Sequence, residues 1–407
     1  MFKRCLILLL SCLPLAAVAD KFADLARTPP MGWNSWNHFG CDIDEDTVRE
    51  IARAMVESGM KDAGYQYVVI DDCWHGERDA NGFIRPDPKR FPSGMKALAD
   101  YVHGLGLKFG LYSDAGWKTC GGRPGSRGYE FQDAATYARW GVDYLKYDWC
   151  NTEGLAARGA YLTMREALWA AGRPIVFSIC EWGDNQPWEW AGEIGHLWRT
   201  TGDITACWDC EVDHGDWSSW GVLRILDVNA ELRAHAGPGR WNDPDMLEVG
   251  NGMSENEDRA HFSMWAMMAA PLIAGNDLRR MSEATRAILT NRAVIAVDQD
   301  PLGIQGFRHR REGELEIWFK PLADDEWAMA VLNRGDRPQQ IRFDWRREAV
   351  VDPLSGRRAR WPARVFELHD LWRGVKIGTT REPLVAEVPG RDVLMLRLRR
   401  LGVRRDG

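Results

Sequence analysis

VDYLKYDWC (142–150) decides the fold of this chain, because an apolar run that can form a buried strand stops there at an acidic residue, Asp148. Runs of this kind recur about every thirty residues, as MGWNSW (31–36), YQYVVI (65–70), KFGLY (108–112), VDYLKY (142–147), PIVFSI (174–179), HLWRT (196–200), GRW (239–241) and PLIAG (271–275). Segments of helical period separate them, for example at 44–61, 130–140, 153–170, 218–234, 255–269 and 282–290. Eight alternating strand and helix units predict an α/β protein with a (β/α)8 TIM barrel over residues 20–303.

A doubly wound open sheet is the structural alternative for the same alternation. That fold usually carries a phosphate-binding fingerprint of three spaced glycines. The nearest stretch here, GLGLKF (104–109), has Phe109 at the third glycine position and precedes a strand. We interpret it as the end of a helix, and the barrel remains the favoured fold.

The pattern changes after DPLG (300–303). Apolar residues then alternate with polar ones, in ELEIWF (314–319), WAMAVL (327–332), QIRFDW (340–345) and DVLMLRL (392–398). This period of two, bounded by Gly, Pro and Asp, predicts a C-terminal antiparallel β-sandwich domain over residues 304–407. Residues 20–300 carry 28 Lys+Arg and 43 Asp+Glu, a net −15, whereas residues 301–407 carry 22 and 16, a net +6. The acid excess therefore belongs to the barrel.

Residues 1–19 have the pattern of a signal peptide. Lys3 and Arg4 precede an apolar run, and Ala17-Val18-Ala19 is a small-x-small cleavage site. The apolar run is shorter than the roughly 20 residues that cross a membrane. A lipoprotein signal ending at Cys12 is the alternative. We expect an exported protein, periplasmic or secreted, with no membrane association after cleavage.

The cysteines point to disulfides rather than to a metal. Removal of the signal leaves Cys41, Cys73, Cys120, Cys150, Cys180, Cys207 and Cys210, an odd number, so at least one is free. Export favours disulfides over zinc thiolates. The Cys207-x-x-Cys210 pair lacks the second ligand pair that a zinc site needs, and the histidines are at least 18 positions apart. No metal and no cofactor is predicted.

Composition narrows the class of partner. The formal net charge of −7 comes from interspersed acids and bases, which argues against nucleic acid as a partner. The 21 tryptophans must either fill the core or contact flat apolar surfaces such as the faces of sugars. Composition alone leaves both uses open, and an oligosaccharide partner and a homo-oligomer are each compatible with it.

Acidic residues follow nearly every predicted barrel strand. They are Asp71, Asp72, Asp114, Asp148, Glu181, Asp203, Asp243, Asp245 and Asp277. Eight tryptophans stand beside them: Trp33, Trp36, Trp74, Trp117, Trp149, Trp182, Trp208 and Trp241. Any one of these acids could be a helix cap, but together they would share the barrel face that carries active sites. A pocket of acids and aromatic rings suits a neutral polyhydroxy ligand.

Two such carboxylates meet the requirement of retaining glycoside hydrolysis, an ionised nucleophile and a protonated acid about 5 Å apart. Lys146 lies two residues before Asp148 and so points the same way, which would hold Asp148 ionised. Asp203 lies among other acids that would raise its pKa, although Arg199 acts in the opposite direction. Spacing alone does not select this pair.

Nine motifs in order resemble one family. They are TPPMGWNSW (28–36), VVIDDCW (68–74), FGLYSDAGWKTC (109–120), YLKYDWC (144–150), CEWG (180–183), WRTTGDI (198–204), WNDPDM (241–246), MWAMMAAPLIAGNDLR (264–279) and VDQDPLGIQG (297–306). This set resembles glycoside hydrolase family 27, the α-galactosidase (melibiase) family, from about Thr28 to Gly306. The resemblance implies retaining hydrolysis of terminal α-D-galactose, with Asp148 as nucleophile and Asp203 as acid/base.

The resemblance also assigns the sugar contacts. It places Asp71 and Asp72 on the 4- and 6-hydroxyls and Lys146 on the 3- and 4-hydroxyls, with Arg199 and Asp203 around the 2-hydroxyl. The other residues that it places around the sugar are Trp36, Tyr112, Cys120, Cys150, Glu181, Trp182, Asp245 and Met246. It implies disulfides Cys41–Cys73 and Cys120–Cys150. Cys180 is expected to be free and buried, because Gly195 stands where some relatives have its partner.

Three alternatives remain at this stage. An α-N-acetylgalactosaminidase would have small residues where Glu181-Trp182 stands, and a β-L-arabinopyranosidase would lengthen one of Asp71 and Asp72 to Glu. A non-catalytic carbohydrate-binding barrel would lack one catalytic acid, and both are present. The Cys207–Cys210 insert lies outside the family pattern, and we interpret it as a disulfide-pinned loop rather than an outer subsite.

Overall fold

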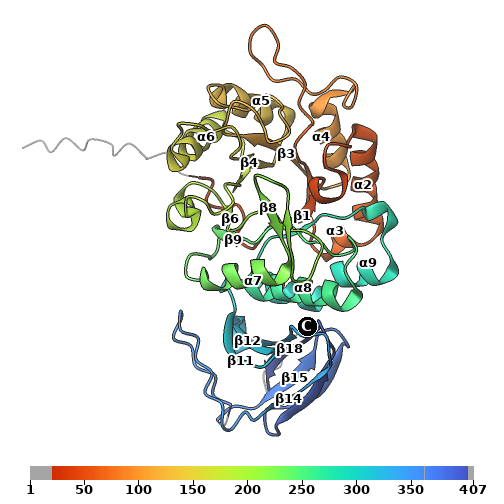
Figure 1. Ribbon diagram of the computed structural model, residues 1–407, viewed down its shortest axis with the longest axis vertical. Helices are drawn as coiled ribbons and strands as arrows, with labels where there is room; N and C mark the ends of the chain where they lie inside the picture. The colour runs from red at the N-terminus through yellow and green to blue at the C-terminus, as the bar shows by residue number, and fades with distance from the viewer. Residues whose placement is uncertain (1–20, 362, 402–407) are drawn as a thin grey trace, which may run out of the picture.

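The computed structural model describes residues 21–361 and 363–401 (Figure 1). Its larger sheet has eight parallel strands in the order β10-β1-β2-β3-β4-β5-β6-β9. These strands are β1 (Met31–Asn34), β2 (Tyr67–Ile70), β3 (Lys108–Asp114), β4 (Tyr144–Asp148), β5 (Val176–Ile179), β6 (Leu197–Arg199), β9 (Trp241–Asp243) and β10 (Leu272–Ala274). All eight predicted strands are confirmed. Because neighbours follow chain order with no reversal, the doubly wound alternative is excluded.

The two edge strands of this sheet, β9 and β10, are joined by the segment that follows β9. Leu247 forms an isolated parallel bridge with Ala274 of β10, and its backbone N–H donates to Ile273 O at 2.8 Å. Gly275 N–H donates back to Leu247 O at 3.1 Å. The strands therefore close into a barrel through a short seam.

Helices surround the barrel. They are α1 (Trp36–Phe39), α2 (Glu45–Glu57), α3 (Met60–Ala63), α4 (Gly94–Gly104), α5 (Glu130–Trp140), α6 (Ala157–Ala171), α7 (Val222–Glu231), α8 (Glu255–Met268), α9 (Glu283–Leu289) and α10 (Arg292–Asp298). Asp44 caps α2 by accepting from Thr47 N–H, and Ser254 and Glu257 form a capping box at α8. The helix expected from residue 218 begins only at Val222, because 218–220 form a strand instead.

That strand belongs to a hairpin, β7 (Glu211–Asp213) and β8 (Ser218–Trp220), inserted between β6 and α7. At its base Cys207 and Cys210 form a disulfide, as interpreted from the sequence. Gly221 N–H donates to Cys210 O and Val222 N–H to Cys207 O, so the loop leads directly into α7. The hairpin is tied at its base by covalent and hydrogen bonds.

The C-terminal domain is antiparallel. One sheet has the order β11-β12-β13-β18-β15-β16 and a second pairs β14 with β17. The strands are β11 (Phe307–Glu312), β12 (Leu315–Pro321), β13 (Trp327–Asn333), β14 (Gln339–Phe343), β15 (Phe366–Asp370), β16 (Val375–Thr379), β17 (Leu384–Val388) and β18 (Val393–Arg400). Phe319 and Trp345 are among the buried residues between these sheets. The predicted β-sandwich is confirmed.

The two domains share one core across their interface. Trp318 alternates with Phe319 on β12, and it packs with the barrel helices while Phe319 packs inside the sandwich. Lys320 Nζ donates to Ala266 O of α8 at 2.9 Å. Trp208, inside the disulfide loop, donates from Nε1 to Arg334 O of the sandwich at 3.0 Å. The insert, the barrel and the sandwich are therefore directly connected.

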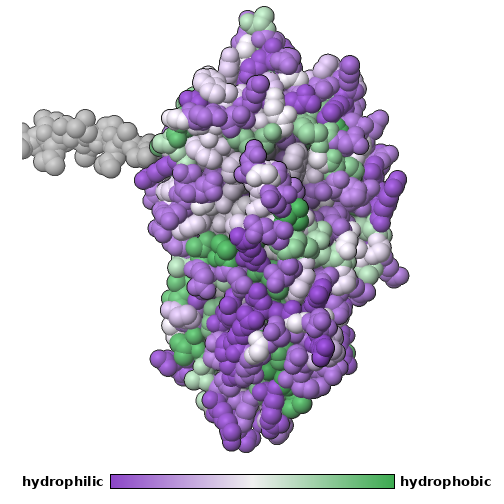
Figure 2. All heavy atoms as spheres, in the orientation of Figure 1, coloured by the Kyte–Doolittle hydropathy of each residue, from purple (hydrophilic) through white to green (hydrophobic). Residues whose placement is uncertain are grey.

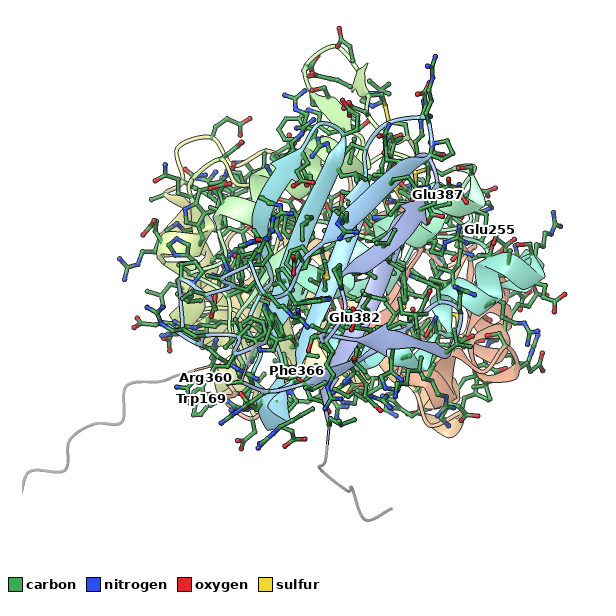
Figure 3. All side chains as sticks on the ribbon, turned by 90° about the horizontal axis from the view of Figure 1, so that it is seen from below. Trp169, Glu255, Arg360, Phe366, Glu382 and Glu387 are labelled. Carbon is green, nitrogen blue, oxygen red and sulfur yellow. A yellow bond between two sulfur atoms is a disulfide. The ribbon has the colours of Figure 1, made fainter. Side chains whose placement is uncertain are left out.

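Ion pairs across the interface bring together the two charge excesses seen in the sequence. Asp227 of α7 accepts from Arg308 at 2.6 Å and from Arg334 at 2.8 Å. Seen from below, the blue strands of the sandwich cross in front of the barrel (Figure 3). A cleft of about 490 Å³ lies between the two domains, and its lining includes Glu255 of the barrel and Glu387 of the sandwich. The acidic barrel and the basic sandwich thus neutralise each other in part.

Most of the face turned to the viewer in Figure 1 is hydrophilic, with scattered hydrophobic patches (Figure 2). Within residues 21–361 and 363–401, the structure contains no helix with the length and apolar character required to cross a membrane. The predicted signal peptide, residues 1–19, lies outside the described residues.

Candidate active site

A buried ion pair lies at the centre of the barrel face formed by the carboxyl ends of the strands. Asp71 directly follows β2, and its Oδ2 accepts from Lys146 Nζ of β4 at 2.8 Å and from Asn34 Nδ2 of β1 at 2.7 Å. The Ser35 hydroxyl accepts from Asp71 N–H. Three strands thus fix one carboxylate. Sequence reasoning missed Asn34 and Ser35, although both stand at the end of a predicted strand.

Asp148 ends β4 and is nearly inaccessible, with 5% of its surface exposed. Its Oδ1 accepts from Trp149 N–H at 3.0 Å. The pKa of Asp148 is raised to about 7, chiefly by burial; Lys146 acts against this rise, and the charges of Asp203 and Asp71 add to it. Lys146 favours the ionised form of Asp148, as expected from the sequence, but burial outweighs this effect and the Lys146 ammonium is paired with Asp71.

The state of Lys146 follows from the same charges. Burial alone lowers the pKa of its ammonium, but Asp71, the Cys180 thiol, Asp148 and Asp203 together hold that pKa well above its usual range. Lys146 is thus a fixed cation among acids. Its ammonium also lies 5.4 Å from the centre of the Tyr112 ring.

Arg199 organises a second group of acids. Its Nη2 lies 3.1 Å from Asp203 Oδ1 and 2.9 Å from Asp245 Oδ2, and it donates to Gly202 O at 2.7 Å. Asp245 also accepts from Ile204 N–H, and burial raises the pKa of its carboxyl. Asp203 differs from the other acids, since a third of its side chain is exposed. Asp203 is therefore accessible to solvent, while the residues on either side of it, Gly202 and Ile204, are held by hydrogen bonds to Arg199 and Asp245.

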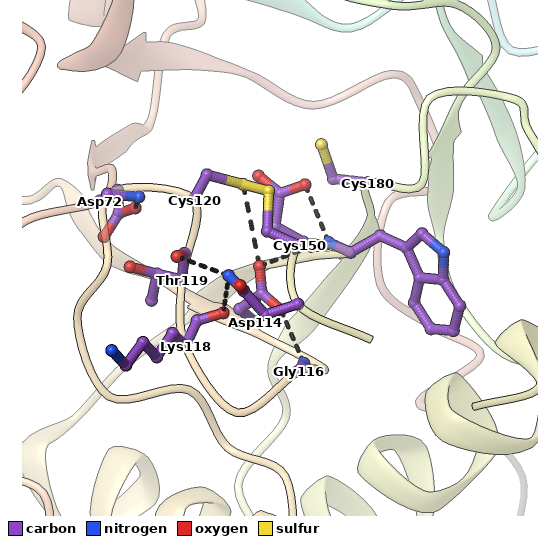
Figure 4. The surroundings of a disulfide bond; sticks show 12 residues. Asp72, Asp114, Gly116, Lys118, Thr119, Cys120, Cys150 and Cys180 are labelled. Atoms are coloured by element: carbon purple, nitrogen blue, oxygen red, sulfur yellow. Dashed lines mark hydrogen bonds between the residues drawn. A yellow bond between two sulfur atoms is a disulfide. The ribbon is translucent and has the colours of Figure 1, made fainter. Parts of the chain in front are cut away.

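The Cys120–Cys150 disulfide joins the loops after β3 and β4 (Figure 4). Tyr112 donates from its hydroxyl to Cys120 Sγ at 3.4 Å, and Asp114 accepts from Cys150 N–H at 3.0 Å. Asp72 accepts from Gly121 N–H at 2.6 Å, which attaches the loop after β2 to the same loop. These bonds build one wall of the site.

The other implied disulfide, Cys41–Cys73, is also present, and Cys180 is buried with no disulfide partner among the described residues. Asp114, Cys120 and Cys150 present donor atoms within 4.8 Å of one another, as a metal site would. Both sulfurs are joined in the disulfide, so they are not available as thiolate ligands.

Two predicted site residues lie in the loop after β5. Glu181 is fully buried, and its Oε2 accepts from both N–H and Nδ2 of Asn185 at 2.7 Å. Burial raises the pKa of Glu181 to about 7. Trp182 is half-buried and has a left-handed φ of 59°. Glu181 thereby ties down the loop that presents Trp182.

The remaining predicted site residues also follow barrel strands. Trp36 begins α1 and is half-buried, and its N–H donates to Asn34 Oδ1. Met246 is 7% exposed and follows Asp245, which has a φ of 77°. Cys73 and Asn151 have left-handed φ as well, so four loops at this barrel face hold non-glycine residues in a strained backbone region. All predicted site residues thus lie at one barrel face.

The expectation for the tryptophans needs correction. Trp33, Trp74, Trp208 and Trp241 are 0–6% exposed, and each donates its indole N–H to a backbone carbonyl. They are core residues, because a ring beside a strand end can point outward into the helix layer as well as into the pocket. Asp277 is likewise a helix cap, accepting from Arg279 N–H.

The barrel face that carries active sites in barrel enzymes gathers four acids, Asp71, Asp148, Asp203 and Asp245. Two paired cations, Lys146 and Arg199, lie among them. This arrangement is typical of a glycoside hydrolase, which is the class of protein that the fold and the site indicate. Comparisons with known proteins identify the family. Residues 28–300 match the family model described as alpha galactosidase A, and residues 312–398 match that of the alpha galactosidase C-terminal beta sandwich domain. The chain belongs to the α-galactosidase (melibiase) family.

Relatives cover nearly the whole chain. It is 61% identical over 382 residues to alpha-galactosidase A of Cellvibrio japonicus, which spans 94% of each chain. Alpha-galactosidase I from Mortierella vinacea superposes with a TM-score of 0.85 at 37% identity, covering 93% of this chain and 98% of that one. The alpha-galactosidase from Saccharomyces cerevisiae with raffinose has a TM-score of 0.85 at 30% identity, covering 94% and 100%.

Proposed function

We propose that this protein hydrolyses terminal α-D-galactosyl residues of oligosaccharides and polysaccharides with retention, using Asp148 as nucleophile and Asp203 as general acid/base. The observation that carries the proposal is the different setting of these two acids at one barrel face. Asp148 is buried, whereas Asp203 is accessible and bonded to Arg199. The charge of Asp203 also contributes to the raised pKa of Asp148.

The reaction proceeds by two displacements. An Asp148 oxygen attacks the anomeric carbon while Asp203 gives its proton to the glycosidic oxygen, so the aglycone leaves as an alcohol. Asp203 then removes a proton from water, and the water oxygen attacks the anomeric carbon and releases Asp148. Each step inverts the centre, and α-galactose is the product.

The binding roles rest on fixed acceptors. Asp71 is held by Lys146 and Asn34, and Asp72 by Gly121, so both carboxylates are positioned before a sugar enters. We assign them the 4- and 6-hydroxyls, Lys146 the 3- and 4-hydroxyls, and Arg199 with Asp203 the 2-hydroxyl. Large residues, Glu181 and Trp182, stand where an α-N-acetylgalactosaminidase would have small ones, which supports galactose over N-acetylgalactosamine.

The relative with bound raffinose supports an oligosaccharide substrate. Three disulfides require an oxidising compartment, which supports export to the periplasm or the medium.

Azide rescue of two variants tests the assignment. Asp148→Gly with an aryl α-galactoside and azide should give β-galactosyl azide, because a single displacement inverts the centre. Asp203→Gly should give α-galactosyl azide, because azide attacks the intermediate on Asp148. Asp277→Asn, a strand-end acid that caps a helix, is the matched control and should keep its activity. Wild-type turnover by Asp148→Asn would overturn the proposal, and aryl β-L-arabinopyranoside in the same assay tests the arabinose alternative.

A further inference from the structure

The β7–β8 hairpin stands directly beside the Asp203 segment. Trp220 N–H of β8 donates to Asp203 O at 2.9 Å, and Thr205 N–H donates to Trp220 O at 2.9 Å. One residue before Asp203, a methyl group on Gly202 would lie 3.6 Å from Ser218 O. The hairpin therefore continues the backbone that carries Asp203, and in Figure 1 it lies in front of the barrel strands.

Register decides which way the hairpin side chains point. Trp220 pairs with Glu211, and both contact Arg224 of α7, whose guanidinium carbon lies 3.9 Å from the centre of the Trp220 ring. Successive side chains on a strand alternate. The opposite face of the hairpin carries Ser219 and, immediately before β8 begins, Trp217.

Trp217 is half in water, with 52% of its surface exposed. One side of its ring stacks on His214, with centroids 4.0 Å apart and planes 22° from parallel. His214 is itself fixed by a 2.9 Å hydrogen bond between Nε2 and Ser219 Oγ, and its backbone N–H donates to Trp217 O. The indole is therefore held in one orientation by His214 while its other face stays open to solvent.

The chemistry around the ring favours a neutral sugar. An indole face stacks on the C–H face of a pyranose, and Asp213 and Asp216 at the exposed tip offer acceptors for hydroxyl groups. The same two carboxylates disfavour an anionic ligand. Because the Cys207–Cys210 disulfide and Trp208 fix the base, the hairpin has little conformational freedom left to lose on binding.

We propose that the β7–β8 hairpin is an aglycone subsite, in which the free face of Trp217 stacks on a neutral sugar on the reducing side of the bond that is cleaved. This inference rests on the proposed function and narrows its substrate class. The enzyme would prefer galactosides whose aglycone is itself an oligosaccharide. It revises the interpretation of the insert as merely a pinned loop.

Paired substrates test it. For Trp217→Ala we expect kcat/KM on galactosyl-mannotriose and raffinose to fall about tenfold, while kcat/KM on 4-nitrophenyl α-galactoside changes less than twofold. Trp217→Phe should restore most of the loss, because it keeps a planar ring. Trp169→Ala is the control, since Trp169 is 42% exposed on α6 and lies at the outer edge of the molecule (Figure 3).

The outcomes separate the two proposals. Equal rates for Trp217→Ala and wild type on every substrate, or an equal loss on both substrate types, would overturn the subsite. A wild-type protein that turns over none of these galactosides would instead overturn the proposed function. Retained aryl activity with selective oligosaccharide loss, rescued by Phe, supports both.

Discussion

Lys146 Nζ lies 2.8 Å from Asp71 Oδ2, so the ammonium of β4 is paired across β3 with the carboxylate that follows β2. This contact assigns Lys146 two tasks. It neutralises the buried Asp71 carboxylate, to which we assign sugar hydroxyls, and its charge lowers the pKa of Asp148. Four predictions follow from this and other contacts.

Replacing Lys146 by Met should move the acid limb of the kcat/KM profile to higher pH by about one to two units. Asp148 attacks as a carboxylate, so activity is lost as the pH falls through the Asp148 pKa, and removing the cation raises that pKa further. Lys146→Arg, which keeps the charge, should leave the limb near its wild-type position. Profiles with an aryl α-galactoside measure this, and an unmoved limb in Lys146→Met would contradict it.

Removing the Cys120–Cys150 disulfide as a double Ser variant should destabilise the fold by about 3–4 kcal/mol, given the 30-residue separation. The wall that holds Tyr112 and Asp72 should also loosen, with kcat/KM falling about ten- to a hundredfold. Urea unfolding and kinetics measure both. The Cys207–Cys210 disulfide closes a separation of only 3 residues. Its double Ser variant should therefore lose less stability, because little loop-closure entropy is involved.

Asp258→Asn should flatten the dependence of stability on pH. Asp258 is 4% exposed, and burial raises its pKa to about 7, while its Oδ2 accepts from Gly250 N–H. The folded state thus holds a proton that the unfolded chain releases near pH 4, so this stabilisation is complete below pH 4 and is lost as the pH rises through about 7.

The melting temperature of wild type should therefore fall between pH 5 and pH 8 by about 2–6 °C more than that of Asp258→Asn. Scanning calorimetry at the two pH values checks it. Parallel slopes in the two proteins would show that Asp258 is ionised throughout.

Trp318→Ala should uncouple the domains. Trp318 is fully buried and packs with the barrel helices, so truncation should cost about 3–5 kcal/mol and divide a single calorimetric transition into two. Phe319→Ala, the next residue on β12, removes a ring from inside the sandwich instead. It should lower the stability of the sandwich alone, and identical thermograms for the two variants would contradict a shared interface core.

The barrel strands could be predicted because each is a short buried run that ends in a polar residue, as VDYLKY does before Asp148. The closing seam could not, since Leu247 lies beyond the last strand and its bridge to Ala274 depends on barrel curvature. The hairpin was missed because Glu211–Asp213 is only three residues long and exposed throughout, which is too short for a pattern to indicate a strand.

The site was predicted as a set of residues but not as a set of contacts. Spacing places Lys146 and Asp148 on the same side of one strand, yet it says nothing of Asp71 two strands away, which takes the ammonium. Position after a strand likewise did not distinguish Trp182, half-buried in a site loop, from Trp74, whose indole is buried and bonded to Tyr112 O. Tertiary packing determines both the partner of Lys146 and the burial of each tryptophan.

The hydrogen bond from Trp208 to Arg334 O joins the loop beside Asp203 to the sandwich. The position of the proposed acid/base therefore depends in part on a domain that holds none of the candidate site residues. A substitution in the sandwich that displaces the Arg334 carbonyl would be transmitted to the loop beside Asp203.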